Sequence, residues 1–203
     1  MREVLLWLRQ HMFTVLIVLA ITAGLALRLF QFGSIPVSLY WDEMAIWNDA
    51  QSIVATGRDM FNRSAWQPLF ISYGDFKLPM YIWLTSLVVN LTNNSLIGAR
   101  LVSLIAGLSM LPATYFLARR LGWGQRQSLV ATALLAILPW SIHFSRVGFE
   151  AHLASALLLW SLVFLFSLTQ LKITPWTRAL FATLAWISSV AAFYTYFSFR
   201  YVW

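Results

Sequence analysis

Five long apolar runs constrain this sequence more than any other feature. Each run has or approaches the roughly 17–25 residues that an α-helix needs to cross the hydrocarbon core of a bilayer. Hydrophobic residues make up 60% of the chain and charged residues 10%, whereas soluble domains average about 45–50% and about 25%. The sequence therefore predicts an all-α membrane protein with transmembrane helices at residues 12–32, 96–118, 128–144, 149–169 and 179–199.

The chain carries a formal charge of +7 and no cysteine. Its basic residues lie in short loops between the apolar runs rather than in one patch, which argues against a nucleic-acid partner and for the lipid bilayer. The absence of cysteine excludes disulfides and thiolate metal sites.

A sixth apolar run, residues 78–92, decides the topology, because it is short for a span. If it lies flat at the membrane surface, the cations of the N-terminus and of two further loops all fall on one side: Arg2, Arg9, Arg119, Arg120, Arg126, Lys172 and Arg178. Six of the seven acidic residues then lie on the other side: Asp42, Glu43, Asp49, Asp59, Asp75 and Glu150. The excess of Lys and Arg in cytoplasmic loops predicts a cytoplasmic N-terminus. Residues 33–95 then form a large outer loop with interfacial helices at 42–57 and 78–92.

Asp42 and Glu43 start the first interfacial helix. Acids in a first turn meet free backbone N–H groups and the positive end of the helix dipole, which is a sufficient local reason for both residues. Glu43, however, lies four residues before Trp47 on the apolar stripe of the helix. A carboxylate directed toward the membrane or protein interior is costly and usually has a partner or a task. This pair is therefore the first candidate for a functional site.

Several other charged residues have two interpretations each. Lys77 either snorkels at the interface or binds a phosphate, and Arg28 and Arg100 are expected to snorkel from the outer ends of their spans. Arg146 and Glu150 either form an ordinary i, i+4 pair or join the acidic pair at the outer level. The loop charges Arg58, Asp59 and Arg63 are expected to be solvated. His143 and His152 have an irregular spacing with Glu150, which does not define a metal site, and a bound divalent metal stays an alternative.

The order of these features resembles that of the GT-C glycosyltransferases. An Asp-Glu pair follows the first span, Lys-x-Pro opens the second interfacial helix, and then come "IGARLVSLIAGLSMLPATYFLARRLG" from Ile97 and "LPWSIHFSRVGFEAH" from Leu138. The sequence is most similar to the protein O-mannosyltransferase relatives, the group that includes the lipid A aminoarabinose transferase. The resemblance covers nearly all 203 residues, and its specificity lies in the order of short, degenerate motifs.

The resemblance implies a role for each candidate residue. Asp42 corresponds to the catalytic base or its orienting group with Glu43 beside it, and Lys77 to a ligand of the donor phosphate. Arg146 and Arg100 are further phosphate-side candidates. Glu150 stands where relatives often carry Asp, and Leu78 where they commonly carry a proline, so the role of Glu150 is less directly implied.

The implied reaction is inverting transfer of a sugar from a polyprenyl-phosphate donor to a protein, lipid or glycan acceptor, with no required cofactor. It would take place on the outer face of a bacterial inner or plasma membrane. Relatives are more than twice as long, so the chain is expected to be the N-terminal part of a GT-C domain. The alternatives are a truncated, non-catalytic protein that binds lipid-linked sugars, and a transporter or flippase, which would place its polar residues near the middle of the membrane.

Overall fold

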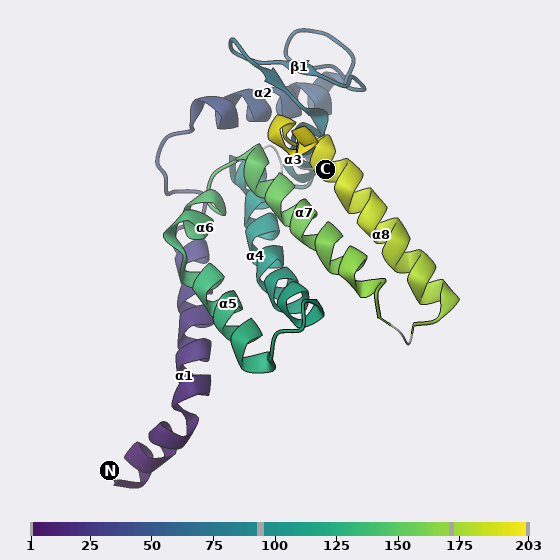
Figure 1. Cartoon of the computed structure of the whole chain (residues 1–203). Helices are drawn as coiled ribbons and strands as arrows, with labels where there is room; N and C mark the ends of the chain where they lie inside the picture. The colour runs from purple at the N-terminus through teal and green to yellow at the C-terminus, as the bar shows by residue number, and fades with distance from the viewer. Residues whose placement is uncertain (1, 93–95, 171–172, 202–203) are drawn as a thin grey trace.

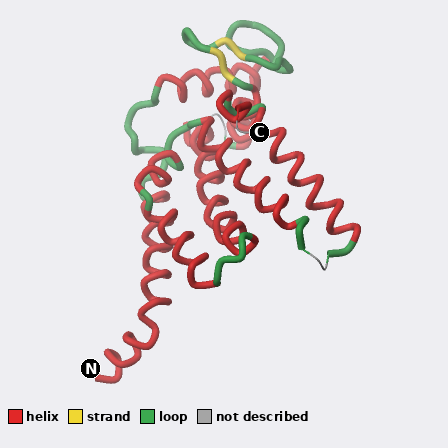
Figure 2. The backbone as a smooth tube through the Cα atoms, viewed as in Figure 1, coloured by secondary structure: helices red, strands yellow, loops and turns green. Residues whose placement is uncertain are grey.

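The computed structural model describes residues 2–92, 96–170 and 173–201, so Lys172 lies outside the described residues. Most of this part of the chain is helical (Figures 1 and 2). The longer helices of the bundle are α1 (Arg2–Leu29), α4 (Leu96–Arg120), α5 (Gln125–Ile137), α7 (Glu150–Ser167) and α8 (Pro175–Phe193). The remaining elements are α2 (Trp41–Thr56), β1 (Phe70–Ile71), β2 (Phe76–Lys77), α3 (Pro79–Leu91), α6 (Pro139–Phe144) and the 3₁₀ helix η1 (Phe197–Tyr201).

The bundle helices pack as neighbours in the order α1, α5, α4, α7, α8. Helix α2 lies across one end of this row, next to α3 and the short β1–β2 hairpin (Figure 1). The N-terminus of α1 and the α4–α5 connection lie at the opposite end. The six acidic residues that we grouped from the sequence therefore gather at the end that carries α2 and α3.

Among the described residues, four helical segments are long and apolar enough to cross a membrane: His11–Leu29, Ile97–Arg120, Glu150–Ser167 and Pro175–Phe193. The protein is therefore a multi-pass integral membrane protein. Helix α3 has only 13 residues, about 20 Å at 1.5 Å per residue, which is shorter than the roughly 30 Å of hydrocarbon. Helices α2 and α3 begin and end within a residue of the interfacial helices expected at 42–57 and 78–92.

The third expected span, residues 128–144, is not one continuous helix. Helix α5 begins earlier than expected, at Gln125, and the chain turns out of the helical conformation at Leu138, where ψ is 119°. Pro139 then starts α6, because its ring fixes φ at a helical value and its missing N–H is harmless at a first position. The last expected span, 179–199, likewise begins earlier, because Thr174 caps α8 at the N–H of Thr177 and Pro175 follows it.

A hydrophobic cluster joins the surface elements to the bundle. It contains buried side chains of α2, β1, α3, α4 and α7: Ile46, Phe70, Tyr81, Ile82, Val102, Ala106, Leu153 and Ala156. Ile46 is buried on the apolar stripe expected for α2, so this stripe faces the bundle. The amide of Met80 also donates to the carbonyl oxygen of Tyr194, which ties the start of α3 to the end of α8.

Asp59 anchors the loop between α2 and β1. Its side chain is fully buried, and its carboxylate accepts hydrogen bonds from the amides of Phe61 and Arg63, from the guanidinium of Arg63 and from Gln67. Burial alone would raise its pKa, but these donors and the charge of Arg63 lower it below the ordinary value. The expectation that Asp59 is a solvated loop charge is therefore wrong: it organises the loop.

Asp49, in α2, is the buried acid beneath this loop. Its Oδ1 accepts from the amide of Met60 at 3.1 Å, and its Oδ2 has no hydrogen-bond partner. Burial raises its pKa from 3.8 to about 6. In the unfolded chain the carboxyl of Asp49 loses its proton near pH 4, whereas in the folded protein it keeps the proton up to about pH 6. The stability that this difference contributes is therefore complete below pH 4 and is lost as the pH rises to about 6.

We expect Asp49→Asn to stabilise the protein at pH 7, because the amide keeps an acceptor for the Met60 amide and removes a buried charge. The pKa difference corresponds to roughly 3 kcal/mol, which sets the upper limit of the gain. Thermal unfolding in detergent between pH 4 and pH 8 measures it, and the variant at pH 4 is the internal control. A gain that does not shrink as the pH falls would contradict this assignment.

Candidate functional site

Lys77 lies at the centre of a cluster of three carboxylates. It ends strand β2, and the antiparallel pairing of Phe70 with Lys77 holds it at the base of the hairpin. Its Nζ lies 2.7 Å from Oδ1 of Asp42, 3.7 Å from Oε1 of Glu150 and 3.9 Å from Oδ2 of Asp75. The structure thus brings together residues from α2, the hairpin and the first turn of α7, which are far apart in the sequence.

The cluster keeps Lys77 charged although the side chain is only 3% exposed. Burial lowers its pKa, but the charge of Glu150 and the hydrogen bond and charge of Asp42 outweigh that effect, so the pKa lies above the ordinary value. Oε1 of Glu150 is buried and has no hydrogen-bond partner, so charge alone relates it to Lys77. The side chain of Asp42 is one-quarter exposed, which leaves it accessible to a substrate.

Glu43 is turned inward, as its place on the apolar stripe indicates, and is 1% exposed. Its Oε1 accepts from Nε of Arg100 at 2.8 Å and from the amide of Gly148 at 2.9 Å. Its Oε2 accepts from Nη2 of Arg100 at 3.2 Å and from the amide of Tyr40 at 3.4 Å. Glu43 therefore joins the start of α2 to α4 and to the loop before α7, and its carboxylate has no free face.

Arg100 and Arg146 hold the loop that follows α1. The Nη atoms of Arg100 donate to the carbonyl oxygens of Gly33, Pro36 and Ser38 at 2.8–3.4 Å. Arg146 donates to the carbonyl oxygens of Leu27 and Ile35. Both side chains are at most 9% exposed, so the expectation that Arg100 snorkels is wrong. In this arrangement the two guanidinium groups bind backbone rather than present themselves as phosphate ligands.

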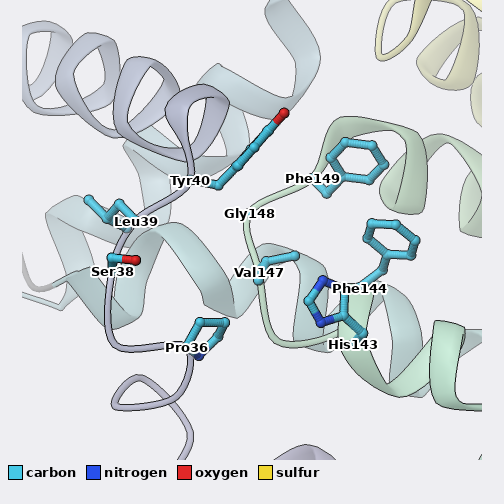
Figure 3. Close-up of a pocket in the computed structure, with 9 residues that line it drawn as sticks. All are labelled: Pro36, Ser38, Leu39, Tyr40, His143, Phe144, Val147, Gly148 and Phe149. Atoms are coloured by element: carbon cyan, nitrogen blue, oxygen red, sulfur yellow. The ribbon is translucent and has the colours of Figure 1, made fainter.

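The loop held by these arginines forms one wall of a cavity of about 520 Å³. Residues 36–40 lie on one side and residues 143–149 on the other (Figure 3). The lining residues are Pro36, Ser38, Leu39, Tyr40, His143, Phe144, Val147, Gly148 and Phe149. Each wall leads along the chain to a carboxylate of the Lys77 cluster, because Asp42 follows Tyr40 by two residues and Glu150 follows Phe149 directly.

The two histidines that the sequence offered as a metal pair lie in different surroundings. His143 is exposed at the cavity, whereas His152 is buried and its Nε2 lies 3.3 Å from Oγ of Ser145. Within residues 2–92, 96–170 and 173–201, no three His, Asp or Glu side chains gather as a metal-binding group.

Sequence reasoning missed Asp75 as a member of the cluster. The sequence does contain an indication that Asp75 lies near Lys77. The two residues are two positions apart in a short extended segment, where alternate side chains share a face. It also missed the link from Tyr81 to Ser103, whose hydroxyls lie 2.7 Å apart, and from Ser103 to the amide of Phe149 at 3.2 Å. That link fixes the loop before α7 to α3 and α4, and it depends on packing that the sequence does not show.

Comparisons with known proteins show the family to which the chain belongs. The family model for dolichyl-phosphate-mannose-protein mannosyltransferases matches residues 77–201, a range that includes Lys77 and Glu150, while Asp42 precedes it. The fold is similar to the crystal structure of ArnT from Cupriavidus metallidurans in the apo state, with a TM-score of 0.67 and 19% identity. That match covers 90% of this chain and 32% of the ArnT chain, so this chain spans about a third of that protein's length.

No curated protein matches the sequence significantly. The family model nevertheless covers more than half of the chain, and the ArnT structure shares its arrangement of helices. The chain belongs to the dolichyl-phosphate-mannose-protein mannosyltransferase family of GT-C membrane glycosyltransferases.

Proposed function

We propose that this protein transfers a sugar from a polyprenyl-phosphate donor to a hydroxyl or amine acceptor on the outer face of the membrane, with inversion at the anomeric carbon. The observation that carries the proposal is the contact of Lys77 with Asp42 and Glu150 beside the cavity. Lys77, to which the proposal assigns the donor phosphate, lies next to the partly exposed carboxylate of Asp42, at the end of the bundle where the proposal locates the lipid headgroup.

In the proposed reaction Asp42 takes the proton of the acceptor, a contribution typically worth about 10²–10⁴-fold in rate. The acceptor atom attacks the anomeric carbon, the bond from that carbon to the phosphate oxygen breaks, and the electron pair leaves with the phosphate. Lys77 stabilises the charge that develops on that oxygen. Attack opposite the leaving group inverts the configuration.

Glu43, Arg100 and Arg146 position the site in this proposal. The Glu43–Arg100 pair holds the first turn of α2, and with it Asp42, against α4. Arg146 and Arg100 hold the cavity wall through backbone carbonyls, so they set where the donor lies. The donor already carries a stable leaving group, and we therefore propose no cofactor. A protein, lipid or glycan acceptor fits equally.

The test is donor binding and sugar transfer by this chain in proteoliposomes with a labelled polyprenyl-phosphate sugar. We expect saturable binding and transfer, with both lost in Lys77→Met. Binding without transfer by the wild-type chain would favour the alternative, a non-catalytic protein that binds lipid-linked sugars. Movement of the labelled lipid between leaflets without transfer would favour a flippase.

We expect the α2–α3 end of the bundle to face outward, with the N-terminus in the cytoplasm, because Arg119, Arg120 and Arg126 lie at the opposite end, where the acidic residues of the α2–α3 end are absent. The chain has no cysteine, so Asp75→Cys and Arg119→Cys each introduce a unique label, and both positions are exposed. An impermeant thiol reagent should label Asp75→Cys in intact cells and Arg119→Cys only after permeabilisation. Labelling of both from one side would mean that residues 78–92 span the membrane.

A further inference from the structure

Arg28 is a fully buried cation inside the bundle, where the expectation that it snorkels to the surface is wrong. Among the described residues no carboxylate pairs with it, and its guanidinium is satisfied by backbone and hydroxyl oxygens instead. The acceptors are the carbonyl oxygens of Gly24 (2.9 Å), Ala136 (2.6 Å) and Leu135 (3.4 Å), and the hydroxyls of Ser141 (2.7 Å) and Ser145 (3.2 Å). A charge held at this depth by neutral acceptors is costly and implies a task.

Two of the three carbonyls that Arg28 binds, those of Leu135 and Ala136, are left without an intrahelical partner by the break between α5 and α6. In a continuous helix the amide of residue 139 would donate to the carbonyl of Leu135, but Pro139 has no N–H. Ala136 lies in the same last turn of α5, whose carbonyls have no intrahelical donors. The guanidinium of Arg28 replaces the missing backbone donors from the side.

Two glycines allow the helices to approach this closely. A Cβ on Gly24 of α1 would lie 2.3 Å from the carbonyl oxygen of Ala136. A Cβ on Gly107 of α4 would lie 2.0 Å from Oγ of Ser145 and 2.8 Å from Nε2 of His152. Small residues that bring backbones together are typical of helix contacts in membranes. The buried polar group around Arg28 is therefore packed from α1, α4, α5, α6 and α7.

The contacts of Arg28 extend directly into the cavity wall. Ser141 belongs to α6 and Ser145 follows it, and residues 143–149 line the cavity and lead to Glu150. We propose that Arg28 is a positioning residue: it stabilises the interrupted helix and so fixes residues 143–149 and Glu150 relative to Lys77. Its predicted effect on sugar transfer rests on the proposed function, whereas its effect on the cavity wall does not.

The first test measures the wall itself. Val37 is 95% exposed and His143 is exposed at the facing wall, so Val37→Cys with His143→Cys carries a pair of spin labels across the cavity. Arg28→Met should broaden and shift the distance distribution, while Arg178→Met, a matched change at an exposed arginine, should not. An unchanged distribution in Arg28→Met would overturn the proposal, whether or not the protein transfers sugar.

The second test asks whether Arg28 acts by binding the carbonyls at the break between α5 and α6. Pro139→Ala returns the backbone N–H that would donate to the carbonyl of Leu135 if α5 continued through Leu138, so it should restore part of the narrow distribution in the Arg28→Met background. If Pro139→Ala has the same effect on the distance distribution in the wild-type and in the Arg28→Met protein, Pro139 and Arg28 act independently, which would contradict the proposal. If Arg28→Met does not fold, Arg28→Lys and Ser141→Ala, which keep part of the donor and acceptor set, replace it in the same comparison.

The third test uses the reaction. Displacement of Glu150 and the wall by about 1 Å should lower kcat by up to about 10²-fold, with little change in donor affinity because Lys77 and Asp42 stay in place. Arg28→Lys should recover more of the rate than Arg28→Met. Loss of donor affinity with an unchanged kcat would contradict the positioning role. A wild-type protein that transfers no sugar would refute the proposed function, and the spin-label comparison would still decide the role of Arg28.

Discussion

Asp42→Asn is expected to lower the rate of sugar transfer by about 10²–10⁴-fold and to leave donor binding largely intact. The amide is nearly isosteric with the carboxylate, so it keeps a hydrogen-bond acceptor for Lys77, which donates to Oδ1 at 2.7 Å. It cannot take a proton from the acceptor substrate at neutral pH. The expected signature is therefore a fall in kcat, measured with a labelled donor in proteoliposomes, rather than a rise in the donor Kd.

Asp49→Asn is the matched control for this experiment. It makes the same chemical change in the same helix, two turns away from Asp42, and its side chain contacts the Met60 amide rather than Lys77. This variant should transfer sugar at the wild-type rate. Undiminished transfer by Asp42→Asn would remove Asp42 as the base, and an equal loss in both variants would point to a general effect of altering α2.

Arg100→Met is expected to destabilise the protein by about 3–5 kcal/mol, because it leaves the buried carboxylate of Glu43 without its cation. Gly148 and Tyr40 would remain as the donors to that carboxylate. For a chain of this size such a loss corresponds to a fall in Tm on the order of 10 °C. Thermal unfolding in detergent, followed by the retention of monodisperse protein, measures it.

The double replacement Glu43→Gln with Arg100→Met separates charge from packing. It removes the uncompensated charge, so it should be more stable than Arg100→Met alone, although the carbonyls of Gly33 and Pro36 still lose their donor. If the double variant is no more stable than Arg100→Met alone, the buried charge is not the cause of the loss. In that case the contacts of Arg100 with the loop after α1 would account for it.

The sequence predicted the charged end of the bundle well, because loop charge and helix length depend on the membrane and not on details of packing. Loop charge also predicted that Asp42, Lys77 and Glu150 lie on the same side of the membrane, and in the structure Lys77 contacts both carboxylates. The apolar stripe also predicted that Glu43 faces inward. These inferences rest on periodicity and charge, which a sequence records directly.

The partners of the arginines were not predictable in this way. Arg28, Arg100 and Arg146 bind carbonyl oxygens, and any residue type supplies a carbonyl. Which carbonyls are free depends on where helices stop and how the loop after α1 folds. Pro139 is a residue that interrupts helices, but the guanidinium that compensates for the interruption lies more than one hundred residues earlier in the chain.

The contact between Lys77 and Asp42 has a consequence for the order of events in the proposed reaction. While no phosphate is present, the ammonium of Lys77 binds one of the two carboxylate oxygens of Asp42, Oδ1, so a hydroxyl that approaches this oxygen must compete with Lys77. An arriving phosphate competes for that ammonium and releases the carboxylate. The site thus predicts ordered kinetics in which the donor binds before the acceptor, with acceptor analogues binding weakly until the donor is in place.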